Sequence, residues 1–329
     1  MTVTGIWAQA QPQWKDRAEY DLSAAITKAI SGNDGAKALE LLKQWKEKYP
    51  TSDFKGTWPQ YELNAYRLMN DPKGMMSAAE AIIAATPDDL TANYWVCTLT
   101  MANNLTGETD LARAEKSGNM LANVTKPAAV PDTSWPPIQK EMTALGHKCI
   151  GVVALNRKDY PKAESEFEAS LKIKSDDAQV NSFLGNVILA QKDPEKQSDA
   201  LFHYARAASY TGAGALPDAV RTQLDAFFVK AYNGYHGEDP QGMQELRNLA
   251  KSNALPPAGF KVLSSAEKDI AADKKMQEEQ PQRFFWMRLK SALTAPNGME
   301  YFEGGMKDAL VPTKEQAPLK GKVVSSTKK

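Results

Sequence analysis

The chain has 329 residues, 42% of them hydrophobic, and its 40 Lys and Arg residues balance its 40 Asp and Glu residues. A chain without net charge has no bulk electrostatic field to draw it to nucleic acid or to an anionic membrane, so neither partner is favoured. No apolar run approaches the roughly 18 residues of a membrane span, and we expect no transmembrane segment.

Residues 1–12 contain a pattern typical of signal-peptide processing. Ala8-Gln9-Ala10-Gln11 has the small-x-small arrangement that signal peptidases cut, although Met1 to Trp7 lacks the basic and apolar regions of a full signal peptide. We interpret residues 1–12 as a signal-peptide remnant or a disordered tail. The expected location is periplasmic or secreted, and the alternative is cytoplasmic.

Apolar residues at helical spacing fill residues 13–255 and divide them into helix pairs. Near the start, Ala38, Leu42 and Trp45 lie on one helix that ends before Pro50. Further pairs are predicted from 61–69 with a helix ending before Pro87, from 95–103 with 111–124, and from 220–235 with 243–251. We expect about five to six pairs in all.

The clearest repeat lies in the middle of the chain, where Gly151 and Gly185 are 34 residues apart. Each glycine follows an aliphatic residue and is followed by a second helix with an alanine and an aromatic residue four positions later. These second-helix residues are Ala163 with Phe167, and Ala200 with Tyr204. Small residues let neighbouring helices approach closely, and the aromatic ring fills the space beside them.

This period and these small-residue positions resemble the tetratricopeptide repeat. The resemblance implies an all-α, right-handed α-solenoid of tetratricopeptide-like helix pairs with a C-terminal capping helix region. The whole chain is also similar to secreted tetratricopeptide proteins of acidobacterial type, through segments 14–20, 45–50 and 297–309. That second resemblance implies export and a binding role, and it brings no known reaction.

In such a solenoid the first helices line a concave groove, where the family usually holds an extended peptide or a partner helix. The side chains off the packing stripe of the two best repeats should face it, and they form the candidate binding site: Lys148, Val152, Asn156, Gln179, Ser182 and Asn186. Asn186 is the best single candidate because an amide both donates and accepts hydrogen bonds. Lys148 also fits the family's clamp for a C-terminal carboxylate, but Val152 replaces the asparagine of that clamp.

Residues with catalytic or metal-binding chemistry do not form a recognisable motif. His147, His203 and His236 lack metal-ligand spacing, and the Asp88-Asp89 and Asp176-Asp177 pairs lie where helices begin, as capping residues do. Cys97 and Cys149 are predicted to be buried in different repeats, more often as free thiols than as a disulfide. We expect no catalytic residue, no enzyme activity, no cofactor and no metal.

The leading hypothesis is a non-catalytic protein–protein interaction scaffold, in the cell envelope, that binds a peptide or partner protein. The alternative is a carbohydrate-binding or enzyme-accessory solenoid with exposed aromatic rings that stack on sugars. The rings for that alternative are Trp58, Tyr61, Tyr66, Tyr94 and Trp95. Stacking requires exposed rings on one face, whereas ordinary helix packing would bury them.

Residues 256–296 are predicted to form capping helices. A charged helix over 264–280 precedes an aromatic helix whose apolar face is formed by Phe285, Trp286, Leu289 and Leu293. That face is expected to cover the open end of the solenoid, with docking to a partner or a membrane surface as the alternative. Residues 297–329 are expected to be a loose tail, with the strand-like segment 319–324 as the start of a truncated β module.

Overall fold

The computed structural model describes residues 12–306, and within this range it consists of helices and connecting turns without a β-strand. The described chain forms two compact units. One comprises residues up to 230 together with 240–260, and the other comprises 231–239 together with 261–306. The processing pattern at Ala8–Gln11 and the strand-like segment 319–324 lie outside the described residues.

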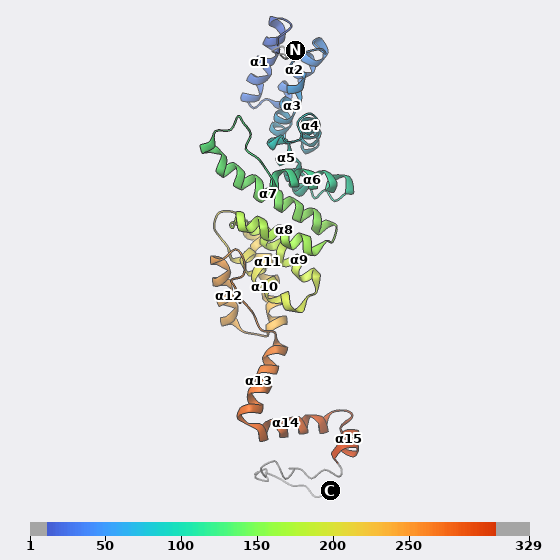
Figure 1. Ribbon diagram of the computed structural model, residues 1–329, viewed down its shortest axis with the longest axis vertical. Coiled ribbons are helices and arrows are strands. Elements are labelled where there is room, and N and C mark those ends of the chain that lie inside the picture. Colours follow the sequence, from blue (N-terminus) through green and yellow to red (C-terminus); the bar gives the residue numbers. More distant parts are fainter. Residues whose placement is uncertain (1–11, 307–329) are drawn as a thin grey trace, which may run out of the picture. The chain divides into compact units, whose positions relative to one another are not determined.

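Helices α1 to α10 follow one another as five pairs (Figure 1). The pairs are α1 (Arg17–Ser31) with α2 (Gly35–Lys48), α3 (Trp58–Leu68) with α4 (Pro72–Ala85), α5 (Leu90–Ala102) with α6 (Glu108–Ala122), α7 (Trp135–Asn156) with α8 (Tyr160–Ile173), and α9 (Ala178–Gln191) with α10 (Gln197–Ser209). Helices α11 (Asp218–His236) and α12 (Pro240–Ser252) follow, and α12 packs on α10.

The turn inside each of the five pairs contains one residue in the left-handed conformation: Asn33, Asn70, Asn104, Lys158 or Lys192. Asparagine tolerates this conformation well, and the residue after it can then cap the next helix. In the first turn Asp34 does so, because its side chain accepts a hydrogen bond from the Lys37 backbone N–H at 2.9 Å. The Asp34 N–H in turn donates to the carbonyl of Ala29 at 2.9 Å, which closes the end of α1.

The two repeat glycines lie where an aromatic ring of the second helix presses on the first helix. A Cβ atom on Gly151 would lie 2.6 Å from the Phe167 ring, and one on Gly185 would lie 2.9 Å from the Tyr204 ring. Both rings are buried. The sequence prediction that small residues permit this close approach is confirmed.

The core is a series of hydrophobic clusters, each of which joins one pair to the first helix of the next. One cluster links α1 and α2 to α3, the next links α3 and α4 to α5, and the series continues through α5–α7 and α7–α9. Each pair therefore packs on its neighbours in sequence, as a solenoid requires. This packing confirms the prediction of an all-α solenoid of tetratricopeptide-like helix pairs.

Helix α7 is longer than the repeat predicts. It begins at Trp135, directly after a 3-10 turn at Asp132–Ser134, and its first turn contains Pro136 and Pro137. Proline is suited to the first turn of a helix, where its missing N–H costs no hydrogen bond. The additional turns precede the repeat's own part of the helix and carry Glu141.

The second unit contains α13 (Ser265–Glu279), α14 (Pro281–Thr294) and the short α15 (Gly298–Tyr301), followed by a π-helical turn at Phe302–Met306. Ser264 and Glu267 form a capping box at the start of α13. On α14 Leu289 is buried, whereas Trp286 and Leu293 are exposed. The capping role of this region stays a prediction.

Replacing Gly151 with alanine tests the close approach of the paired helices. We expect Gly151→Ala to lower the free energy of unfolding by about 1–3 kcal/mol, because the new methyl group would overlap the Phe167 ring. Gly234→Ala is the matched control, since a Cβ there meets no atom within 4 Å. That variant should be stabilised by up to about 1 kcal/mol. Urea denaturation measures both, and equal effects at the two positions would contradict the prediction.

Candidate functional site

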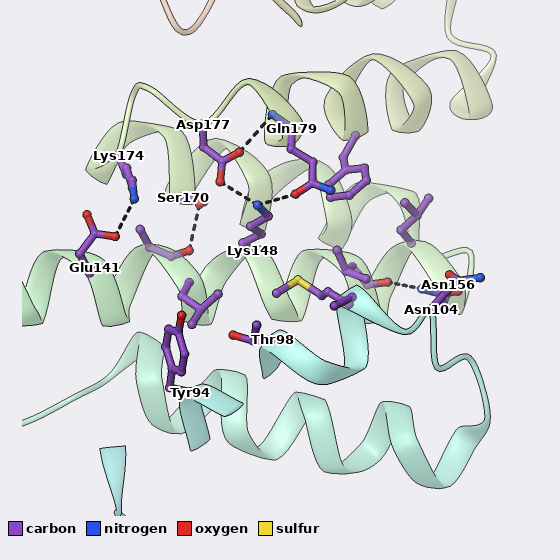
Figure 2. A pocket seen from close by; sticks show the side chains of 17 residues that line it. Tyr94, Thr98, Asn104, Glu141, Lys148, Asn156, Ser170, Lys174, Asp177 and Gln179 are labelled. Carbon is purple, nitrogen blue, oxygen red and sulfur yellow. Dashed lines mark hydrogen bonds and ion pairs between the residues drawn. The ribbon is translucent and has the colours of Figure 1, made fainter. Parts of the chain in front are cut away.

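A pocket of about 620 Å³ lies between the first helices of three successive pairs (Figure 2). Its walls come from α5, α7 and α9, with two residues from α8 and its C-terminal end. Figure 2 shows Tyr94 and Thr98 of α5 on one side and Asp177 and Gln179 on the other, with α7 between them. A second hollow of about 680 Å³ is lined mainly by turns, at 86–91 and 120–128.

Lys148 of α7 links two successive first helices on the polar side of the pocket. Its Nζ donates to Asp177 Oδ2 at 2.8 Å and to Gln179 Oε1 at 2.9 Å. The other Asp177 oxygen, Oδ1, accepts from the backbone N–H groups of Gln179 and Val180 and so caps α9. The aspartate therefore serves both as the cap expected from the sequence and as the partner of the Lys148 cation.

A second ion pair lies nearby, between Glu141 of α7 and Lys174 at the end of α8. The two charged groups are 2.6 Å apart, and the hydrogen bond to Glu141 raises the pKa of Lys174. Beside this pair, the Ser170 hydroxyl donates to the carbonyl of Ala144 at 2.9 Å. Both lysines that line the pocket are thus paired with carboxylates that also line it.

The remaining wall of the pocket is apolar and half-buried. Met101 comes from α5, Val152 and Leu155 come from α7, and Phe183 comes from α9. The Phe183 ring packs against Phe167 with 5.4 Å between ring centroids. The side of the Phe183 ring that meets the pocket is therefore held in place by the core beneath it.

Four of the six predicted site residues line this pocket: Lys148, Val152, Asn156 and Gln179. Asn156 and Gln179 are exposed. The Asn156 amide nitrogen donates to the Val152 carbonyl at 2.8 Å, and this bond does not use its Oδ1 acceptor. Whether these residues bind a ligand stays a prediction.

Ser182 and Asn186 do not line the pocket. The Tyr204 hydroxyl of α10 donates to Asn186 Oδ1 at 2.7 Å, so the acceptor of this amide already has a partner in its own repeat. Burial of the phenol raises the pKa of Tyr204. The structure thus places Asn186 beside the second helix of its pair.

Sequence reasoning missed the contribution of α5 to the pocket. Thr98 and Met101 lie four and seven residues after Tyr94 on this helix, and Asn104 follows in the left-handed turn. The spacing i, i+4, i+7 marks one helical face and could have revealed them. In the sequence analysis, Tyr94 was one of the five rings of the sugar-binding alternative.

The five aromatic rings of that alternative are all half-buried. Trp58 and Tyr61 pack on the cluster around Trp45, with ring centroids 6.0 Å from it. Tyr66 and Trp95 pack on the next cluster along the chain. The five rings are thus neither fully exposed nor fully buried, and the sugar-binding alternative stays a prediction.

The three histidines each have a local partner. His147 lies 2.7 Å from Glu166, and His236 contacts the Leu263 carbonyl and Asp239. His203 is buried, with Nδ1 2.9 Å from Asn181 Oδ1, and burial lowers its pKa from 6.5 to about 3. In the described part of the chain, no group of three or more His, Cys, Asp or Glu side chains is arranged to hold a metal ion.

Comparison with known proteins gives distant structural similarities. No family model and no curated protein matches the chain. Among solved structures, PilF of Pseudomonas aeruginosa is 12% identical, with a TM-score of 0.43 over 84% of this chain and 98% of PilF. A thermophilic tetratricopeptide protein of Thermus thermophilus is 15% identical, with a TM-score of 0.34 over 65% of this chain and 98% of the other.

None of the helices within residues 12–306 combines the length and the apolar character that crossing a membrane requires.

The buried His203 makes stability depend on pH. Below pH 6.5 the unfolded chain binds a proton at this imidazole, whereas the folded chain binds it only near pH 3, so acid favours unfolding across this window. Between pH 8 and pH 5 we expect His203 to cost about 2 kcal/mol. In His203→Gln the drop in unfolding free energy between these two pH values should be smaller by that amount, as measured by urea denaturation. An unchanged drop would contradict the buried, neutral state of His203.

Proposed function

We propose that the chain is a non-catalytic scaffold that binds an extended polypeptide segment in the pocket between α5, α7 and α9. The observation that carries this proposal is the composition of the walls: hydrogen-bonding amides and hydroxyls face an apolar strip, and the charges are paired with one another. Among the described residues that line the pocket there is neither a histidine nor a cysteine.

The polar groups suit a peptide backbone. The Lys148 ammonium group donates a hydrogen bond to Gln179 Oε1, so the NH₂ group of Gln179 can donate to a ligand. Asn156 Oδ1 can accept a hydrogen bond from a ligand, because the Asn156 amide bonds to Val152 through its nitrogen. Thr98 adds a hydroxyl from the opposite wall, and a hydroxyl can do either. An extended peptide offers alternating N–H and C=O groups, and this lining can satisfy both kinds.

The paired charges select against a charged ligand. Lys148 and Lys174 are 15% and 32% exposed in their side chains, and each already lies within hydrogen-bonding distance of a carboxylate. A ligand carboxylate would have to displace Asp177 or Glu141 and leave that group without its partner, which is costly for a partly buried charge. This favours an uncharged segment over a C-terminal carboxylate or a nucleic-acid phosphate.

The apolar strip favours an aliphatic side chain in the bound segment. Met101 of α5 offers a polarisable sulfur and a methyl group. Val152 and Leu155 of α7 add aliphatic surface. Burial of one leucine-sized side chain contributes about 1.5–3 kcal/mol, enough to fix the register of a peptide. The proposed ligand is therefore an extended, uncharged segment with at least one aliphatic residue.

We further propose that this binding takes place in the cell envelope. Support for the location comes from the small-x-small pattern at Ala8–Gln11 and from the sequence resemblance to secreted tetratricopeptide proteins.

Selection from a random peptide display library on the purified chain tests the binding proposal. We expect the selected peptides to be uncharged and aliphatic. Calorimetry with a selected peptide should show at least about tenfold weaker binding to Val152→Glu, because the new carboxylate replaces apolar surface of the strip and the cation four residues earlier, Lys148, is already paired with Asp177.

The matched control is Val220→Glu, which places the same carboxylate on α11 away from the pocket lining at a position that is 39% exposed. This variant should bind like the wild type, and thermal denaturation of both variants checks that they are folded. Equal weakening in both variants, or selection dominated by acidic peptides, would contradict the proposed site.

A further inference from the structure

Two buried thiols from different repeats meet beneath the pocket. Cys97 of α5 and Cys149 of α7 are 0% and 1% exposed, and they belong to the same hydrophobic cluster. Both Sγ atoms lie at the backbone carbonyl of Ala114 in α6, at 3.9 Å and 3.4 Å. The two cysteines are 52 residues apart in the sequence, so only the packing of successive pairs brings them together.

The Cys149 thiol also lies close enough to the Cys97 thiol to affect its pKa. Burial raises the pKa of the Cys97 thiol well above its usual value, and a hydrogen bond with Cys149 raises it further. The Cys97 thiol is therefore protonated in the folded chain, and both thiols are shielded from solvent. The small side chain of Ala114, which is fully buried, is what allows α5 and α7 to approach on this face of α6.

We propose that Cys97 and Cys149 form an intrachain disulfide that joins α5 to α7 when the chain folds in the presence of a disulfide oxidant. One thiolate attacks the oxidant's disulfide and releases a thiol, and the second thiolate attacks the resulting mixed disulfide and releases the other thiol. The protein loses two protons and two electrons, and the oxidant is reduced to two thiols.

The timing of the reaction follows from burial. Attack requires a thiolate that the oxidant can reach, and burial removes this access to both thiols once α5, α6 and α7 have packed. The disulfide therefore forms during folding or during a local opening of these helices. In an oxidising compartment the pair closes as the repeats assemble, and in a reducing one it stays as two thiols.

The disulfide would also fix the spacing of two pocket walls. Thr98 and Lys148, the sequence neighbours of the two cysteines, both line the pocket. Any effect of the disulfide on peptide affinity would rest on the proposed function, whereas formation of the disulfide does not depend on peptide binding. The experiment therefore measures the cross-link directly.

The full chain is unfolded under reducing conditions and refolded in a mixture of oxidised and reduced glutathione. We expect an intact mass lower by two hydrogen atoms and, after non-reducing digestion, a peptide pair linked through Cys97 and Cys149. The oxidised chain should melt roughly 5 °C or more above the reduced chain, since the link closes a long loop.

Cys149→Ala is the control, because its remaining Cys97 cannot close the ring. This variant should show the same melting temperature in oxidising and reducing buffer and should carry a free or glutathionylated thiol. The linkage assay on the wild type does not depend on the stability of the variant. Two free cysteines, two glutathione adducts or disulfide-linked dimers after oxidative refolding would overturn the proposal.

Discussion

The helix pairs depend on a turn in which one residue adopts the left-handed conformation between the two helices. In three of these turns, at Asp34, Asp71 and Asp159, the following residue is an aspartate that caps the second helix. The turn thereby fixes where the second helix begins, and this start determines which of its residues face the first helix. The meeting of Phe167 with Gly151 follows from that register. Lysine at 158 and 192 adopts this conformation at a steric cost of about 1–2 kcal/mol, which the surrounding packing offsets.

The pocket is a consequence of this register repeated along the chain. Because each second helix packs behind its own first helix, α5, α7 and α9 present their free faces to the same side. Polar residues on these faces then bond between repeats, as Lys148 does with Asp177. Such an ion pair joins successive repeats, and it leaves neither charge available to a charged ligand. The ion pairs that stabilise the stack of repeats therefore also disfavour charged ligands.

Sequence periodicity predicted the elements that local chemistry determines. Gly151, Gly185 and their aromatic partners were identified because the 34-residue spacing is visible in the chain, and the capping role of Asp89 and Asp177 follows from their position before apolar helices. The pocket was predicted less completely, since its walls come from three pairs and their convergence depends on how successive repeats rotate.

Periodicity also cannot show which polar atoms are already bonded. Asn186 has an exposed position, yet its acceptor is used by Tyr204 from the next helix. The adjacency of Cys97 and Cys149 depends on the packing of three helices, so the sequence could only give a disulfide as the less frequent alternative to free thiols.

The first two pairs hold an aromatic cluster with a consequence for how unfolding can be followed. Trp45 is fully buried, its indole N–H donates to the buried Glu19 carboxylate at 2.9 Å, and Trp14 and Trp58 lie beside it. Three of the six tryptophans in the described part of the chain thus report on one end of the solenoid. In a protein whose repeats contact only their neighbours, the two ends can separate from the stack independently. Intrinsic fluorescence is therefore weighted towards the loss of the N-terminal pairs, whereas far-ultraviolet circular dichroism averages over every helix, and the two signals can reveal an unzipping that neither reveals alone.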